Sequence, residues 1–184
     1  YEESLALNQE LANTTGVATA LINLGAVALQ QRDYGRATTL LEKVLALERS
    51  VKDKRGIALT LINLGDVARY QADYSRARAS FVESLQLLWE LGDKEGVAGA
   101  LEGLAGVAVA QGQSDRAARL WGAAEALREA IHAPLMPADR TRYDATLAGA
   151  RAQLGDESFM AALAEGKAMN FEQAIDSVIS DSDS

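Results

Sequence analysis

The chain has 184 residues, is 48% hydrophobic but only 5% aromatic, contains no cysteine and carries a formal net charge of −8. This composition excludes disulfides and thiolate metal sites, suits helices, and disfavours an all-β fold, which uses more β-branched and aromatic residues. The acidic chain has no basic stripe, so nucleic acid is not an expected partner, because phosphate contacts dominate that affinity. No segment approaches the about 18–20 apolar residues of a membrane span, so no membrane contact is expected.

Residues 1–12 match the last twelve positions of the 40-residue repeat that follows them, with Leu5 and Leu7 in register with Leu45 and Leu47. We therefore expect the second helix of a truncated repeat here, and a chain that is a piece of a longer solenoid. Leucines left uncovered on such a terminal helix predict self-association through it.

Three segments, 13–52, 53–92 and 93–132, then align without a gap. The recurring residues include Gly16, Gly56 and Gly96, Leu24, Leu64 and Leu104, and Ala37, Ala77 and Ala117. A fixed period of this length indicates stacked helical units, each of which buries its apolar face on the next one.

Each repeat is predicted to form two helices. In the second repeat, Asp53 is the expected N-cap of the first helix and Asp73 that of the second helix, and Gly92-Asp93 closes the repeat and caps the next helix. The corresponding second-helix caps of the other repeats are Asp33, and Ser114 or Asp115.

Beyond residue 132 the pattern loosens. Two prolines within 133–137 predict a linker, after which residues 138–154 and 156–167 form a divergent fourth helical pair within 133–169. A three-residue insertion restores the register, so that Met160 corresponds to Ala117.

The last residues are predicted to form a capping helix. Asn170 and Gln173 have the spacing of a capping box, which opens a short helix over 171–179 in a terminal segment, 170–180. The tail 181–184 is expected to be disordered.

Catalytic chemistry finds little support in these residues. Without cysteine, and with His132 as the single histidine, neither a Cys-His pair nor a His-rich metal site can form. We expect no catalytic residue, no metal and no cofactor. The glycines of the third repeat have helical spacing, which predicts close helix packing around Trp121 and Gly122 and not a phosphate loop: Gly96, Gly99, Gly103 and Gly106.

The alternation of large and small residues resembles the tetratricopeptide repeat. Leu61, Leu64-Gly65 and Ala68 on the first helix, then Ala77 and Phe81 on the second, follow its pattern, and the other two repeats match in register. The resemblance implies an all-α fold, an α-α superhelix built as a solenoid of antiparallel helix pairs. It also implies binding of a protein or peptide on the concave face, which first helices line.

A binding groove is predicted at the first-helix positions between the packing residues. The candidate residues are Ile22, Asn23, Leu59, Ile62, Asn63, Asp66, Arg69, Tyr70 and Glu102. Convergent polar groups beside apolar ones are typical of ligand sites. The alternative is that Asp66 pairs with Arg69 or Tyr70 along one solvated helix. A carboxylate clamp is not expected, because glycines occupy the positions that its basic residues would need.

The last third is similar to the C-terminal helical region of large bacterial ATP-dependent regulators, of the LuxR type or linked to cyclases. The residues that carry this resemblance lie within 117–128, 133–140 and 165–169. It implies a non-enzymatic, cytoplasmic sensor or docking scaffold, with a small effector as a further candidate ligand. The alternative is a structural spacer or self-association module without a groove ligand.

Overall fold

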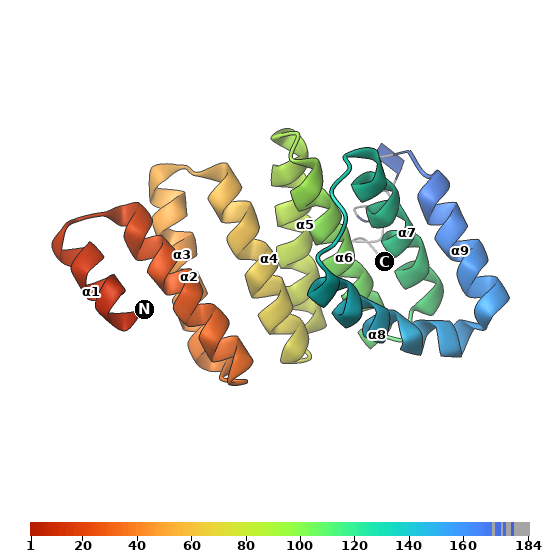
Figure 1. Ribbon diagram of the computed structural model, residues 1–184, viewed down its shortest axis with the longest axis horizontal. Coiled ribbons are helices and arrows are strands. Elements are labelled where there is room, and N and C mark those ends of the chain that lie inside the picture. Colours follow the sequence, from red (N-terminus) through yellow and green to blue (C-terminus); the bar gives the residue numbers. More distant parts are fainter. Residues whose placement is uncertain (171, 174, 176–177, 179–184) are drawn as a thin grey trace. The chain divides into compact units, whose positions relative to one another are not determined.

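The computed structural model describes residues 1–170, 172, 173, 175 and 178, and this part of the chain is helical apart from short turns and the 131–136 linker (Figure 1). It divides into two compact units, an N-terminal unit of residues 1–80 and a C-terminal unit of residues 81–184, with the division falling inside one helix. No strand occurs among the described residues.

The N-terminal unit is a row of packed helices. Its elements are α1 (Glu2–Glu10), α2 (Thr14–Gln30), α3 (Tyr34–Val51), α4 (Lys54–Tyr70) and the first residues of α5 (Tyr74–Glu90). α1, α2 and α3 each pack on the next helix along the chain. Ala37 and Ala77 are completely buried, as expected for small residues where two helices approach closely. The predicted all-α fold of α-α solenoid type is confirmed.

The turns repeat every 20 residues, at half the period seen in the sequence. One residue with left-handed backbone ends each helix from α1 to α7: Ala12, Arg32, Lys52, Ala72, Gly92, Gly112 and His132. The following amide donates to the carbonyl five residues earlier, for example Asp53 N to Glu48 O at 2.9 Å and Asp93 N to Leu88 O at 2.9 Å. This is a Schellman ending, which satisfies carbonyls that the helix end leaves open.

From Ala12 to Gly112, the residue after each left-handed position is the N-cap of the next helix. The side chains of Asp33, Asp53, Asp73 and Asp93 each accept a hydrogen bond from the backbone N–H three residues on, as predicted. The third repeat is different, and the prediction of Ser114 or Asp115 as its cap is wrong. Its N-cap is Gln113, whose side chain makes no capping bond. The Ser114 hydroxyl donates to Gln153 Oε1 instead, at 2.8 Å, and Asp115 pairs with Arg119.

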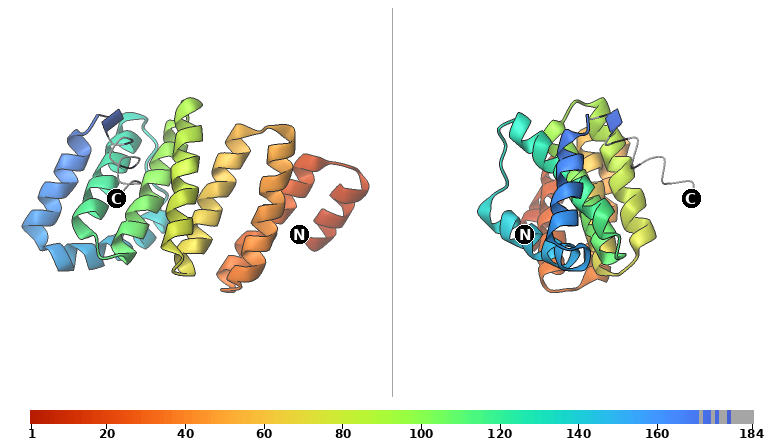
Figure 2. Two further views of the ribbon diagram at one scale, coloured as in Figure 1. Left: turned by 180° about the vertical axis from the view of Figure 1, so that it is seen from behind. Right: turned by 90° about the vertical axis from the view of Figure 1, so that its right-hand side faces the viewer.

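The C-terminal unit contains the rest of α5, then α6 (Lys94–Ala110), α7 (Ser114–Ala130), α8 (Pro137–Leu154) and α9 (Asp156–Ala168). α9 lies along α7, whereas α8 runs crosswise to both (Figures 1 and 2). A Cβ on Gly122 would collide with the backbone of Leu163, and one on Gly166 with that of Arg119. Glycines therefore bring α7 and α9 into close contact.

Two expectations for the fourth pair are corrected. The helix begins at Pro137 and not after it, because proline lacks only an N–H that the first helical turn leaves unpaired anyway. Met160 does not take the role of Ala117, since it is 51% exposed while Ala117 is completely buried. Phe159 and Ala162 are the buried residues of this turn.

The predicted capping box is present at the start of the last segment. Asn170 N donates to Gln173 Oε1 at 3.0 Å, and Gln173 N donates to Asn170 Oδ1 at 2.8 Å. Residues 172, 173, 175 and 178 are helical. The remaining residues of the predicted helix 171–179, and the tail 181–184, lie outside the described residues. Among the helices that the structure describes, none is long and apolar enough to cross a membrane.

Candidate functional site

A groove of about 480 Å³ lies in the N-terminal unit, between the N-terminal halves of α2 and α4 and the end of α3. Three predicted binding residues line it: Ile22 on α2, and Leu59 and Asn63 on α4. We call this site the α2–α4 groove. Its other lining residues are Thr14, Thr15, Ala18, Thr19, Leu47, Glu48, Val51, Asp53, Arg55, Gly56 and Thr60.

The predicted residues Asp66, Arg69 and Tyr70 form a separate cluster near the C-terminal end of α4. Arg69 Nη2 lies 3.0 Å from Asp66 Oδ1, and the guanidinium carbon lies 4.6 Å from the centre of the Tyr70 ring. The Tyr70 ring stacks on Tyr34 with centroids 6.0 Å apart. Burial alone would lower the pKa of Arg69, but Asp66 and Tyr70 raise it. Asp66 therefore pairs with Arg69 along α4, which is the alternative that the sequence left open.

The other predicted residues do not line the α2–α4 groove. Asn23 and Ile62 are half-buried on α2 and α4. Glu102 belongs to the C-terminal unit, where it is almost fully buried and lines a different cavity. Gly103, next to Glu102, is buried against the Phe81 ring, which leaves no room for a Cβ.

Glu48 is the unexpected member of the α2–α4 groove. It lies on α3 and is 8% exposed, and Thr60, which faces it from α4, is 1% exposed. Within the described residues, Glu48 Oε2 and Thr60 Oγ1 each lack a hydrogen-bond partner of normal geometry. A buried polar atom without a partner costs about 1–3 kcal/mol, so its presence calls for an explanation.

The environment raises the pKa of Glu48 above its ordinary value of 4.5. Burial is the largest cause, and the negative charge of Asp53 adds to it. The nearby Thr60 hydroxyl opposes the shift without reaching hydrogen-bond geometry. Asp53 itself caps α4 by accepting from Gly56 N at 2.9 Å.

The repeat places Glu48 at a packing position. In the first two repeats, the side chain at this position packs against the glycine in the first turn of the following helix. A Cβ on Gly56 would come within 2.8 Å of Glu48 Oε1, and a Cβ on Gly96 would come within 2.7 Å of a Leu88 methyl group. This contact accounts for the recurring glycine. The residues at this position, 40 residues apart, are Asn8, Glu48, Leu88 and Arg128.

A second cavity, of about 680 Å³, lies in the C-terminal unit. Trp121 of α7 and the extended linker residues Pro134 and Leu135 supply its apolar surface, and Trp121 also contacts Tyr143 with ring centroids 4.8 Å apart. We call it the Trp121 cavity. Its charged and titratable lining residues are Glu102, Glu125, Arg128, Glu129, His132 and Arg140.

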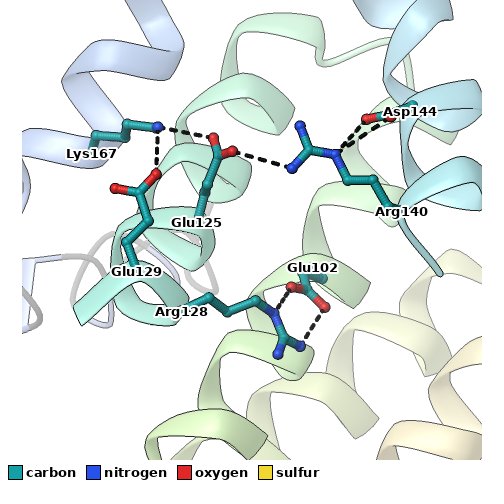
Figure 3. Close-up of polar contacts among 7 residues, drawn as sticks. All are labelled: Glu102, Glu125, Arg128, Glu129, Arg140, Asp144 and Lys167. Carbon is teal, nitrogen blue, oxygen red and sulfur yellow. Dashed lines mark hydrogen bonds and ion pairs between the residues drawn. The ribbon is translucent and has the colours of Figure 1, made fainter. Parts of the chain in front are cut away.

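Glu102 and Arg128 form the most buried ion pair of this cavity (Figure 3). Arg128 donates from Nε to Glu102 Oε1 at 2.5 Å and from Nη2 to Oε2 at 3.1 Å. Burial alone would lower the pKa of Arg128, but the hydrogen bonds and charge of Glu102 raise it. In the first two repeats the position of Glu102 holds Ile22 and Ile62, so the third repeat has acquired both members of the pair.

A second network surrounds Glu125. Its carboxylate lies between Arg140 of α8, at 3.5 Å, and Lys167 of α9, at 3.1 Å, while Lys167 also contacts Glu129 at 3.1 Å (Figure 3). Arg140 further pairs with Asp144 at 3.2 Å. These contacts join α7 to both helices of the divergent pair.

Sequence reasoning missed Glu48 because the second helix of a repeat was assigned to packing. The available signal was the alignment itself, which sets a carboxylate in register with Leu88. The Trp121 cavity could not be predicted, since one of its walls is a linker without a repeating pattern. In the described part of the chain, no group of three or more histidine, cysteine or acidic side chains is arranged to hold a metal ion.

Comparison with known proteins gives one family. The sequence profile of the tetratricopeptide repeat family matches residues 16–88, which is less than half of the chain. No curated protein gives a significant match. The family match and the helical repeat together support a tetratricopeptide repeat protein, and such repeats generally mediate protein–protein interaction or scaffolding.

Proposed function

We propose that the chain is a non-enzymatic interaction scaffold that binds a protein or peptide segment in the α2–α4 groove. The observation that carries the proposal is the position of Ile22, Leu59 and Asn63, three residues predicted for binding, along one groove between consecutive first helices. Leu59 is 39% exposed and supplies apolar contact area, and Asn63 can donate to or accept from a peptide backbone.

The wider context belongs to the same proposal. The resemblance of the last third to bacterial ATP-dependent regulators supports a cytoplasmic sensor or docking role in signalling or transcription regulation. The Asp66–Arg69–Tyr70 cluster offers an exposed aromatic ring at the C-terminal end of α4, which also lines the groove, and Tyr70 and Arg69 are residue types often found as binding anchors. A second contact of the partner at this cluster is part of the proposal.

The test begins with twelve-residue peptides selected by phage display against the full chain. Affinities of the selected peptides are then measured by fluorescence anisotropy for Leu59→Asp and for Leu91→Asp. Both leucines are comparably exposed, at 39% and 45%, but only Leu59 lines the α2–α4 groove. We expect Leu59→Asp to weaken binding about tenfold or more and Leu91→Asp to leave it unchanged. Equal effects of the two variants would contradict the proposal.

A second candidate function is binding of a small effector in the Trp121 cavity. Its volume of about 680 Å³ lies within the usual range for small-molecule sites, and its apolar wall is framed by fixed charges. A fragment screen followed by Trp121 fluorescence tests this. Saturable quenching that Leu135→Asp removes supports the effector, and quenching that is unaffected by this change counts against it.

Self-association is proposed through α1. Leu7 is 58% exposed and Leu11 75% exposed, which leaves apolar surface on this helix. Light scattering across a concentration series should show a dimer that Leu7→Lys/Leu11→Lys abolishes. A monomer at every concentration would contradict it.

A further inference from the structure

We propose that Glu48 is the anchor of a subsite, within the α2–α4 groove, that takes a positively charged ammonium or guanidinium group carried by the bound peptide. The inference rests on the proposed function, because it names the chemistry of the segment that the groove receives. Three observations lead to it: the fold does not need this carboxylate, the carboxylate lacks a partner, and its surroundings suit a cation on an apolar stem.

The repeat itself shows that the fold does not need a carboxylate at this position. Leu88, at the equivalent place one repeat later, is completely buried against Gly96 and fills the same packing role. A leucine there stabilises by burying apolar surface, whereas a buried carboxylate pays a desolvation penalty. Glu48 therefore occupies a position where a simpler residue serves the structure.

The two other polar residues in this register have their partners. Asn8 donates to Ser4 O at 2.8 Å and accepts from Asn13 Nδ2 at 2.8 Å. Arg128 is paired with Glu102 through two hydrogen bonds. Within the described residues, Glu48 alone of this series keeps a buried polar atom, Oε2, without a partner. A molecule bound in the groove can supply the atom that completes its hydrogen bonding.

The groove around Glu48 favours a cation. Its charged lining residues are Glu48, Asp53 and Arg55, while α2 contributes none, so acids outnumber bases by two to one. The raised pKa of Glu48 reflects the same excess of negative charge and burial, which a bound cation relieves. The Thr60 hydroxyl, also without a partner, can accept a second N–H from the same group.

The apolar residues of the groove suit the stem of a long basic side chain. Val51 at 61% exposure and Leu59 at 39% lie at its open side, and Ile22 is half-buried on the facing helix. Lysine and arginine cover such surface with their methylenes while the charged head reaches a polar partner. The peptide is therefore expected to be basic where it crosses α4.

The test uses n-butylammonium and n-butylguanidinium chloride as probes on the full chain, which separates an ammonium from a guanidinium source. Carbon-13 NMR of the glutamate side chains and the amide signals of Gly56 and Thr60 report on the site. We expect saturable shifts with one or both cations, with 1-butanol and butyrate producing shifts at least about tenfold weaker. Equal shifts with 1-butanol would overturn the subsite, because charge would then play no part.

Two variants complete the experiment. Glu48→Leu, which copies the residue at position 88, should abolish the cation-dependent shifts and raise the thermal midpoint. Glu42→Gln changes an exposed carboxylate outside the groove; it should leave the cation-dependent shifts unchanged and should not raise the thermal midpoint. Cation shifts that persist in Glu48→Leu, or a lowered midpoint, would overturn the proposal. Since the probes contain no peptide, these outcomes are independent of whether peptides bind the groove at Leu59.

Discussion

The two units of this protein each bury a glutamate in a helical repeat, and they treat it in opposite ways. Glu102 in the C-terminal unit accepts two hydrogen bonds from Arg128. The other repeats have neither member of this pair: isoleucines stand at the position of Glu102, and unrelated residues at the position of Arg128. Glu48 in the N-terminal unit keeps one buried oxygen without a partner. A repeat scaffold makes such a comparison possible, because equivalent positions serve as internal controls. The paired charge of Glu102 is neutralised within the fold, whereas we propose that a ligand neutralises the unpaired charge of Glu48.

Removing one member of the paired set gives the largest expected effect. Arg128→Met leaves Glu102 buried without its cation and should lower the free energy of unfolding by about 3–5 kcal/mol. Restoring an apolar pair, Glu102→Ile with Arg128→Leu, should recover most of this loss. Urea unfolding measures both. If the double variant lost as much free energy of unfolding as Arg128→Met, the ion pair would contribute to stability beyond neutralising its own buried charges.

Removing the unpaired carboxylate should act in the opposite direction. Glu48→Leu eliminates a buried polar atom without a partner and should raise the free energy of unfolding by about 1–3 kcal/mol. The same urea titration, run beside Arg128→Met, compares the two units directly. A destabilised Glu48→Leu variant would mean that Glu48 supports the fold and that the contrast between the units is mistaken.

The pH dependence of stability sharpens the contrast. The folded-state pKa of Glu48 is raised above 4.5, so the folded protein binds its proton more tightly than the unfolded chain does. Its contribution to stability is complete below pH 4.5 and is lost as pH rises through the raised pKa, at no more than about 1.4 kcal/mol per pH unit. The stability advantage of Glu48→Gln over the parent should therefore grow from pH 4.5 upward. An advantage that does not change with pH would contradict the assignment.

An exposed ion pair should matter least. Arg76 and Glu42 lie 2.7 Å apart, with side chains 44% and 54% exposed. Solvent screening limits such pairs, so Glu42→Gln should lower the free energy of unfolding by no more than about 0.5 kcal/mol. Urea titration with and without added salt checks this. If Glu42→Gln lowered the free energy of unfolding as much as Arg128→Met does, burial could not explain why the Glu102–Arg128 pair matters more than the Glu42–Arg76 pair.

The fold was predictable because it depends on short-range rules that repeat. The Asp caps, the small residues Ala37 and Ala77 and the capping box at Asn170 are each encoded within a few positions, and periodicity multiplies the signal. The cap of α7 was not predictable, because the Ser114 hydroxyl donates its hydrogen bond to Gln153, 39 residues along the chain. The predicted equivalence of Met160 and Ala117 was wrong for a related reason, since glycine contacts between α7 and α9, distant in sequence, set the packing of α9.

The site was predictable only in part. Ile22, Leu59 and Asn63 follow from the first-helix pattern, which assigns outward positions to the groove. Asp66, Arg69 and Tyr70 share that pattern, but their mutual contacts gather them near the other end of α4. Glu48 comes from a second helix, and its importance lies in a missing partner. A missing partner depends on the positions of neighbouring atoms, which periodicity does not contain.

A double-mutant cycle across the α2–α4 groove tests most directly whether Glu48 binds a cation. One change is Glu48→Gln, and the other replaces the basic residue of a groove-selected peptide with norleucine, with affinities measured by calorimetry on the full chain. We predict that the two changes are strongly coupled: once either is made, the other costs at least about tenfold less in affinity. Strictly additive effects would show that Glu48 does not contact the basic group, and the proposed cation subsite would then be wrong.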